Sequence, residues 1–277
     1  MRISIKKSLL PLQIIVMLYA LGGIVLYYMQ DKILFPHLHE QKKQAFVNIV
    51  PQNVIEIPVN KDDTLHLYHF VPSDDTVSKG LVIFLHGGEG NVFSYANRAD
   101  EFLRLNYEVW MPEYSFLEKQ DKPFSVEDVS TAAVQTFILA KNNDAAKRRI
   151  VVYGQSIGVI GAASIARSLS GDNKNKVTII LENPFSSLAD VLHHQTYIYP
   201  WSVMCKYKSD PLEDFKASEV KVSYCTRFDG SLFSEASSQG YRELLKSPND
   251  LLKVPVEKAK ALNETQLYQN WLANLMR

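Results

Sequence analysis

The distribution of apolar residues after position 50 predicts a series of short strands and helices. Two segments, 54–58 and 65–70, alternate between apolar and polar residues and are joined through Lys61-Asp62-Asp63, which predicts an antiparallel hairpin. Short apolar runs then recur at 81–85, 107–111, 150–153, 177–181, 220–225 and 251–256, and helical patterns separate most of them. Strands that alternate with helices are typical of parallel βαβ units. We therefore expect an α/β fold with a mostly parallel central sheet and helices on both faces.

A long apolar segment near the N-terminus predicts one transmembrane helix. Residues 9–29 are apolar apart from Gln13, tyrosines and small residues, and about 20 residues are enough to span a bilayer. Basic residues precede the segment, so the positive-inside tendency places the N-terminus in the cytoplasm and the main domain outside it. A cleaved signal peptide is the alternative, because Ala20-Leu21-Gly22 fits a small-residue cleavage pattern. Apolar character continues over 24–28 and favours the uncleaved anchor.

The chain after the anchor divides into a polar connector and one large domain. We expect an anchor at 1–30, a connector at 31–52 and the domain at 53–277. Between 181 and 220 the chain shows no clean helical or strand period and carries His193-His194 and several aromatic residues. Open α/β sheets bind ligands at the carboxyl ends of their strands, so a small cap-like insertion is expected at about 188–215. An ordinary packed loop is the alternative.

Composition and charge narrow the range of partners. Thirty basic and thirty acidic residues give a net charge of zero, so no overall field attracts nucleic acid. The two cysteines, Cys205 and Cys225, fit no zinc or redox motif, and no cluster of metal-binding side chains has ligand spacing. We therefore expect no metal and no organic cofactor. The spacing leaves open whether the two cysteines pair in an oxidising compartment.

The strongest chemical motif is G-x-S-x-G at 154–158, centred on Ser156. It follows the apolar run at 150–153 and precedes a helical segment rich in small residues, at 159–166. A nucleophile elbow needs glycines on both sides of the serine, because side chains there would collide with the neighbouring strand and helix. The strand, turn and helix context predicts that Ser156 is a catalytic nucleophile.

A second motif, His86-Gly87-Gly88, follows the buried run at 81–85. In elbow-containing hydrolases the loop after this strand supplies one N–H of the oxyanion hole, and the residue after the nucleophile supplies the other. These donors are Gly87 and Ile157 here. His86 is interpreted as a structural hydrogen-bonding residue, because it lies on the oxyanion side of the expected site.

These motifs, taken in order, resemble the BEM46-type branch of the α/β-hydrolase superfamily. Its members are similar in an N-terminal membrane segment, a strand ending in His-Gly, the G-x-S-x-G elbow and a Glu-Asn-x-Phe-x-Ser stretch, which is 182–187 here. The resemblance implies an α/β-hydrolase fold and a serine acyl hydrolase of the esterase, thioesterase or lysophospholipase kind. The implied substrate is a hydrophobic small-molecule or lipid-derived ester.

The resemblance also implies a catalytic acid and exposes a missing base. Asp229 follows the run at 220–225, where relatives carry the acid, although Asp229-Gly230 is also an ordinary turn signal. Glu182 is a reserve candidate for the acid. Relatives carry Gly-His-Asn after the last strand, whereas this chain places Leu262 at the histidine position. Leucine accepts no proton, and the histidines that remain as possible substitute bases are His193 and His194.

Two functions from different classes therefore stay open. The first is a membrane-anchored acyl ester hydrolase that uses Ser156 with a relocated base or with weak activity. The second is a catalytically inactive α/β-hydrolase-fold protein that serves as a binding or scaffold protein. The loop at 112–118, which replaces the Tyr-Arg-Gly-Tyr-Gly-x-Ser loop of relatives, supports the second. A lysine base at Lys258 or Lys260 is disfavoured by the charged segment around it.

Overall fold

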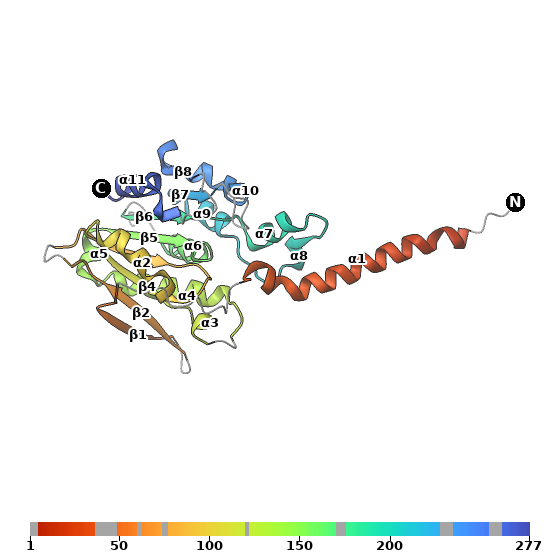
Figure 1. The fold of residues 1–277 in the computed structure, drawn as a ribbon, viewed down its shortest axis with the longest axis horizontal. Coiled ribbons are helices and arrows are strands. Elements are labelled where there is room, and N and C mark those ends of the chain that lie inside the picture. Colours follow the sequence, from red (N-terminus) through yellow and green to blue (C-terminus); the bar gives the residue numbers. More distant parts are fainter. Residues whose placement is uncertain are drawn as a thin grey trace.

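An eight-stranded mixed sheet forms the centre of the molecule (Figure 1). The computed structural model describes residues 5–36, 49–59, 63–73, 77–119, 122–169, 176–227, 235–254 and 262–277. The strand order is β1-β2-β4-β3-β5-β6-β7-β8, and only the pairs β1–β2 and β2–β4 are antiparallel. The strands are β1 Asn53–Pro58, β2 Thr64–Phe70, β3 Leu81–Leu85, β4 Glu108–Pro112, β5 Ile150–Gln155, β6 Val177–Glu182, β7 Val222–Arg227 and β8 Leu251–Val254.

The opening hairpin and the parallel order predicted from the sequence are both confirmed. The β1–β2 hairpin pairs Asn53 with His69 and Pro58 with Thr64. The parallel strands are buried on both faces, and every residue of β3 is inaccessible to solvent, which explains their continuous apolar runs. Strand β7 begins at Val222, two residues after the start of the apolar run that predicted it. Residues 251–254 of the final run form β8, and 255–256 lie outside the described residues.

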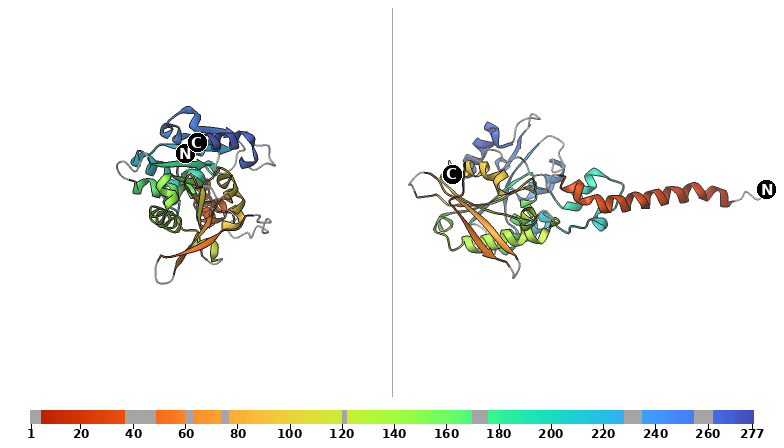
Figure 2. Two further views of the ribbon diagram at one scale, coloured as in Figure 1. Left: turned by 90° about the vertical axis from the view of Figure 1, so that its left-hand side faces the viewer. Right: turned by 60° about the horizontal axis from the view of Figure 1, so that its bottom comes forward.

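Helices cover both faces of the sheet and form two apolar cores (Figure 2). On one face the core includes side chains of α4 Val126–Ala140, α5 Asp144–Arg148, α6 Gly158–Ser168 and α9 Pro211–Ser218. On the other face it includes side chains of α2 Val92–Leu103 and α11 Gln266–Leu275. The described chain also contains the short helices α3 Ser115–Glu118 and α10 Glu235–Ser238 and the 3-10 turns Gln239–Leu244, Pro248–Asp250 and Leu262–Glu264.

A long helix, α1 Ile5–Leu34, projects away from the domain (Figures 1 and 2). Its part from Leu10 to Leu34 has a mean hydropathy of 2.0 and is long and apolar enough to cross a membrane. The helix continues four residues beyond the anchor expected at 1–30. Its last turn is part of the domain, because Leu34 is buried in the core and the Gln30 side chain is fully buried.

Gln30 joins α1 to the chain far downstream. Its side-chain amide donates to the carbonyl of Met204 at 3.0 Å, and its side-chain oxygen accepts from the backbone N–H of Lys206 at 2.8 Å. The Tyr207 hydroxyl donates to the carboxylate of Asp31 close by. The end of α1 is therefore held by specific polar contacts as well as by apolar packing.

The interval between β6 and β7, for which no helical period was visible, contains three short helices. They are α7 Leu188–Gln195, α8 Trp201–Met204 and α9. With four to eight residues each, they are too short to show a 3.6-residue period clearly. Helix α9 packs on α6 as part of the domain, whereas residues 188–208, named here the α7–α8 segment, lie beside α1 (Figure 1).

The two cysteines do not pair. Cys205 follows α8 and Cys225 lies in β7, and both are buried and free. Burial raises the pKa of each thiol above its usual value, so both act as small apolar side chains.

Candidate active site

Ser156 lies on a tight turn between β5 and α6. Its φ of 52° is in the left-handed region, which non-glycine residues seldom adopt, and its backbone N–H donates to the carbonyl of Glu182 at 3.0 Å. A Cβ atom at Gly158 would lie 2.0 Å from the carbonyl oxygen of Leu85, so only glycine fits there. The local geometry is that of a nucleophile elbow.

Gly87 lies next to Ser156 on the side expected for the oxyanion donors. A Cβ atom built on Gly87 would be 3.6 Å from the Ser156 Cβ and 2.7 Å from the Tyr95 hydroxyl. Any side chain at position 87 would therefore enter the space between the serine and the tyrosine. Tyr95 also fixes the loop, because its hydroxyl accepts the backbone N–H of Glu89 at 3.1 Å. Ile157, the other predicted donor, is buried immediately before α6.

His86 and Glu113 form a buried pair behind this loop. The His86 Nδ1–H donates to the carbonyl of Gly87 at 2.8 Å, and its Nε2 lies 3.4 Å from the Glu113 carboxylate. The imidazole ring lies between the rings of Tyr95 and Tyr114, at 5.0 and 4.5 Å. These contacts hold the ring in place, while the buried Nε2 has no hydrogen-bond partner among the described residues, and the structural role of His86 stays a prediction.

Glu113 links the start of α2 to the backbone after β4, beside the loop that carries Gly87. One carboxylate oxygen accepts the backbone N–H of Val92 at 2.6 Å, at the start of α2, and the other accepts the N–H of Tyr114 at 3.1 Å. The Tyr114 hydroxyl donates to the carbonyl of His86 at 3.1 Å. The loop at 112–118 that departs from the family pattern is therefore a structural support for the loop that carries Gly87.

A buried network of charged and phenolic groups involves Glu182, whose carbonyl binds the Ser156 N–H. Arg98 of α2 donates to the Glu182 carboxylate at 2.9 Å, and the Tyr153 hydroxyl donates to the same oxygen at 2.6 Å. Arg98 also pairs with Glu101 and donates to the Tyr268 hydroxyl at 3.1 Å. Burial opposes the charge on Arg98, but the two carboxylates hold its pKa well above the usual value.

This network was not predicted from the sequence. The sequence makes Glu182 a reserve candidate for the acid, whereas the structure engages that carboxylate with Arg98 and Tyr153. The only visible signal was the Arg98-x-x-Glu101 spacing, which places the two side chains on one side of a helix.

In the described part of the chain, no hydrogen bond joins the Ser156 side chain to a residue predicted for the triad. Asp229, in the loop after β7, lies outside the described residues. Leu262 is 1% exposed and belongs to the apolar core on the α2 and α11 face. His193 and His194 lie in the last turn of α7, where their contacts are the Tyr197 ring and, for His194, the Asp190 carboxylate at 3.6 Å.

Metal ligands are not gathered anywhere in the described ranges. No group of three or more His, Cys, Asp or Glu side chains there could hold an ion.

Comparison with known proteins places this geometry in context. No protein-family model matches the chain. The protein Bem46 of Schizosaccharomyces pombe is 30% identical over 186 residues, which are 64% of this chain and 60% of Bem46. The match therefore spans less than two thirds of that relative's length.

Solved structures share the fold at low sequence identity. Est1E from Butyrivibrio proteoclasticus superposes with a TM-score of 0.57 at 12% identity, over 79% of this chain and 95% of that one. A proline iminopeptidase of Mycobacterium smegmatis gives 0.57 at 11% identity, over 81% and 97%. An acetyl xylan esterase from Paenibacillus sp. R4 gives 0.56 at 11%, over 90% and 93%.

Proposed function

We propose that the chain, which has the α/β-hydrolase fold, is a BEM46-like, membrane-anchored serine hydrolase acting on carboxylic esters. The observation that carries the proposal is the elbow: Ser156 has a φ of 52° and its Cβ faces the position of a Gly87 side chain at 3.6 Å. A strained turn of this kind persists only where the surrounding structure holds it. Esterases are among the proteins that share the fold.

The chemistry would be acyl transfer in two steps. The Ser156 hydroxyl oxygen attacks the ester carbonyl carbon, and the alkoxy group leaves as an alcohol with the proton that the serine loses. Water then attacks the acyl-enzyme and releases the carboxylic acid and free Ser156. The N–H groups of Gly87 and Ile157 would donate to the carbonyl oxygen as negative charge develops on it. A hydrophobic small-molecule or lipid-derived ester is the substrate class that we propose.

The site lacks its usual base at the position after β8. Leu262 accepts no proton, and Asp229, our candidate acid, would have no imidazole to orient there. His193 and His194 are the remaining candidates, but their contacts are with Tyr197 and Asp190. We therefore propose a weak hydrolase, whose rate rests mainly on substrate binding and the oxyanion donors.

The membrane part of the proposal rests on α1. Its apolar length fits one span, and the basic residues before it support our proposal that the N-terminus is cytoplasmic and the domain lies outside the cytoplasm.

Labelling with a fluorophosphonate probe tests the proposal. The full chain in detergent micelles should label at Ser156, and the Ser156→Ala variant should not. Ser164→Ala is a matched control, because Ser164 lies in α6 and its hydroxyl is hydrogen-bonded to Ser130 and to the carbonyl of Ile160. A folded protein that does not label, even with a long incubation, would refute Ser156 as a nucleophile.

The alternative is an inactive binding protein, and the burial of Leu262 supports it. A protein that binds a long-chain ester without hydrolysing it, and does not label, would establish this alternative.

A further inference from the structure

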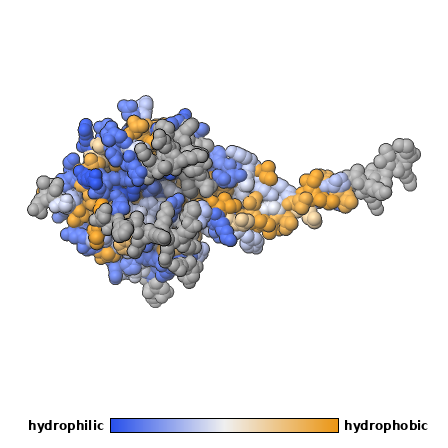
Figure 3. Space-filling model, viewed as in Figure 1, coloured by the Kyte–Doolittle hydropathy of each residue, from blue (hydrophilic) through white to orange (hydrophobic). Residues whose placement is uncertain are grey.

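An exposed apolar tip lies between helices α7 and α8. Tyr197, Ile198 and Val203 are 66%, 70% and 78% exposed, although all three are large apolar side chains. They belong to the segment that lies beside α1, whose own apolar residues are also exposed. In Figure 3 apolar residues run along α1 and continue to the part of the domain that it joins. Exposed apolar surface of this kind marks an interaction site.

Three contacts determine the position of this tip along the axis of α1. The Tyr19 hydroxyl donates to the carbonyl of Ile198 at 2.8 Å, and the Tyr199 hydroxyl donates to the carbonyl of Tyr19 at 3.3 Å. The two tyrosine rings are stacked, with centroids 4.8 Å apart. Ile198 therefore lies level with Tyr19, in the middle of the helix.

The length of α1 then determines where the tip lies relative to a bilayer. The apolar stretch from Leu10 to Leu18, before the contact, rises only about 14 Å at 1.5 Å per residue. The hydrocarbon core of a bilayer is about 30 Å thick. A membrane crossed by α1 must therefore extend past Tyr19, towards Tyr27 and Tyr28, and it must include the level of Ile198.

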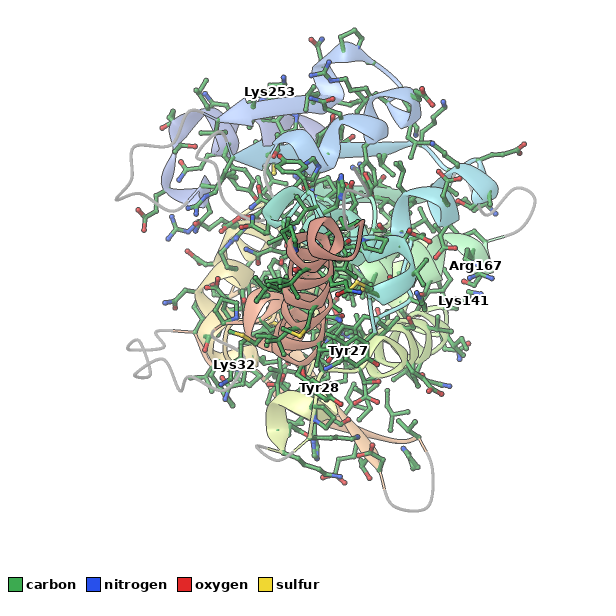
Figure 4. The ribbon with its side chains drawn as sticks, turned by 90° about the vertical axis from the view of Figure 1, so that its right-hand side faces the viewer. Tyr27, Tyr28, Lys32, Lys141, Arg167 and Lys253 are labelled. Carbon is green, nitrogen blue, oxygen red and sulfur yellow. The ribbon has the colours of Figure 1, made fainter. Side chains whose placement is uncertain are left out.

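Charged and aromatic groups indicate the other boundary of the hydrocarbon. The ammonium group of Lys206 lies 5.1 Å from the Tyr27 ring and 5.9 Å from the Tyr28 ring, and 3.7 Å from the Asp31 carboxylate. Figure 4, viewed from the N-terminal side of α1, shows Tyr27, Tyr28 and Lys32 in front of the domain. Tyrosine and lysine side chains are typical of the lipid headgroup level. Tyr27 lies about 12 Å along the helix axis from Tyr19, so the headgroup level lies at about that distance from the tip.

Several polar groups of the tip are hydrogen-bonded within the protein. The carbonyl of Ile198 accepts from Tyr19, and the Trp201 side chain donates to the Thr196 carbonyl and hydroxyl at 3.1 and 2.8 Å. The N–H of Met204 donates to the carbonyl of Pro200 at 3.1 Å. Internal pairing of polar groups is what a lipid environment requires.

We propose that the α7–α8 segment is a second membrane contact, whose tip, residues 197–203, inserts into the bilayer leaflet nearest the domain. The partner is the lipid surface itself. A hollow of about 520 Å³ between α1 and the tip, lined by Tyr19, Ile24, Tyr28, Tyr199 and Met204 among others, receives lipid chains. The inference rests on the proposed anchor and is independent of catalysis by Ser156.

The contact brings the candidate active site towards the membrane. The α7–α8 segment follows β6, whose carboxyl end lies beside the end of β5 that leads to Ser156. An ester that resides in the bilayer would therefore reach the elbow from the lipid side.

Depth-dependent fluorescence quenching tests the proposal on the full chain in phosphatidylcholine vesicles. An NBD label is placed on Val203→Cys, on Val77→Cys as a matched control of 76% exposure, and on Val16→Cys as a reference within α1. The native cysteines are buried, and the unsubstituted chain taken through the same labelling gives the background. Lipids that carry a doxyl group at mid-chain should quench the labels at 203 and 16 at least twofold more than the label at 77.

The outcomes separate the tip from the anchor. If the label at 16 is quenched and the label at 203 behaves like that at 77, the tip lies in water and the inference is wrong while the anchor stands. If neither label is quenched, the anchor fails and the inference fails with it.

Discussion

Replacing Arg98 with methionine should destabilise the domain strongly, because the change leaves two buried carboxylates without their cation. Arg98 is paired with Glu182 at 2.9 Å and with Glu101, and its guanidinium lies within 5.8 Å of the rings of Phe84, Tyr153 and Tyr268. Methionine fills a similar volume, so the main loss is electrostatic. Removing one partner of a buried ion pair costs about 3–5 kcal/mol of unfolding free energy. In a domain of this size each kcal/mol shifts the Tm by about 2–4 °C, so a fall of about 10 °C is expected.

The cost should diminish when the orphaned carboxylate is also removed. Thermal unfolding of the full chain in detergent, followed by circular dichroism, compares Arg98→Met, Glu182→Gln and the double variant. Glutamine at 182 keeps the shape and can still accept from Tyr153, so the double variant should recover about 1–3 kcal/mol relative to Arg98→Met. Arg104→Met is the matched control, because Arg104 is 79% exposed beside Asp100. A fall in Tm no larger than that of the control, or a double variant no more stable than Arg98→Met, would refute the reasoning.

Three further predictions concern the site and the response to pH. Leu262→His should raise the rate of ester hydrolysis about 100-fold or more if only the base is missing. Leu262→Asn is the control, because it adds polarity without a base and should leave the rate unchanged. Equal rates for the two variants would show that the pocket differs in more than the base. Gly158→Ala should abolish fluorophosphonate labelling and lower the Tm, since its Cβ would lie 2.0 Å from the Leu85 carbonyl oxygen; unchanged labelling would contradict the elbow geometry. A hydrogen bond from His69, then Ser78, and nearby charge hold the pKa of Glu108 below its usual 4.5 despite partial burial. This carboxylate therefore stabilises the fold above about pH 4.5 and loses that contribution as the pH falls through the lowered pKa, so acid unfolding of Glu108→Gln should depend less steeply on pH than that of the parent chain.

The central sheet was predictable because its signal is local. Parallel strands buried on both faces appear as apolar runs, and β3, buried at every residue, is the clearest case. The elbow was predictable for the same reason, since the two glycines, the serine and the flanking strand and helix are contiguous in the sequence.

The parts that were missed depend on contacts between distant segments. Arg98 and Glu182 are 84 residues apart, and the sequence around each residue does not predict their contact. The helix α1 continues to Leu34 because Gln30 finds its partners at Met204 and Lys206, more than 170 residues away. Helices α7 and α8 are too short to show a helical period in the sequence. Their position beside α1 depends on tertiary contacts, which a local pattern does not predict.

The buried Gln30 ties the end of α1 to the domain through hydrogen bonds to Met204 and Lys206. If α1 spans a membrane as proposed, a change in its tilt would be passed on to the domain, whereas a flexible tether would not pass it on. A transmembrane helix adjusts its tilt to the thickness of the bilayer. In membranes of different thickness, the carboxyl end of β5, which leads to Ser156, would therefore lie at different angles and heights above the bilayer. The lipid composition of the membrane would then change the access of substrate to Ser156.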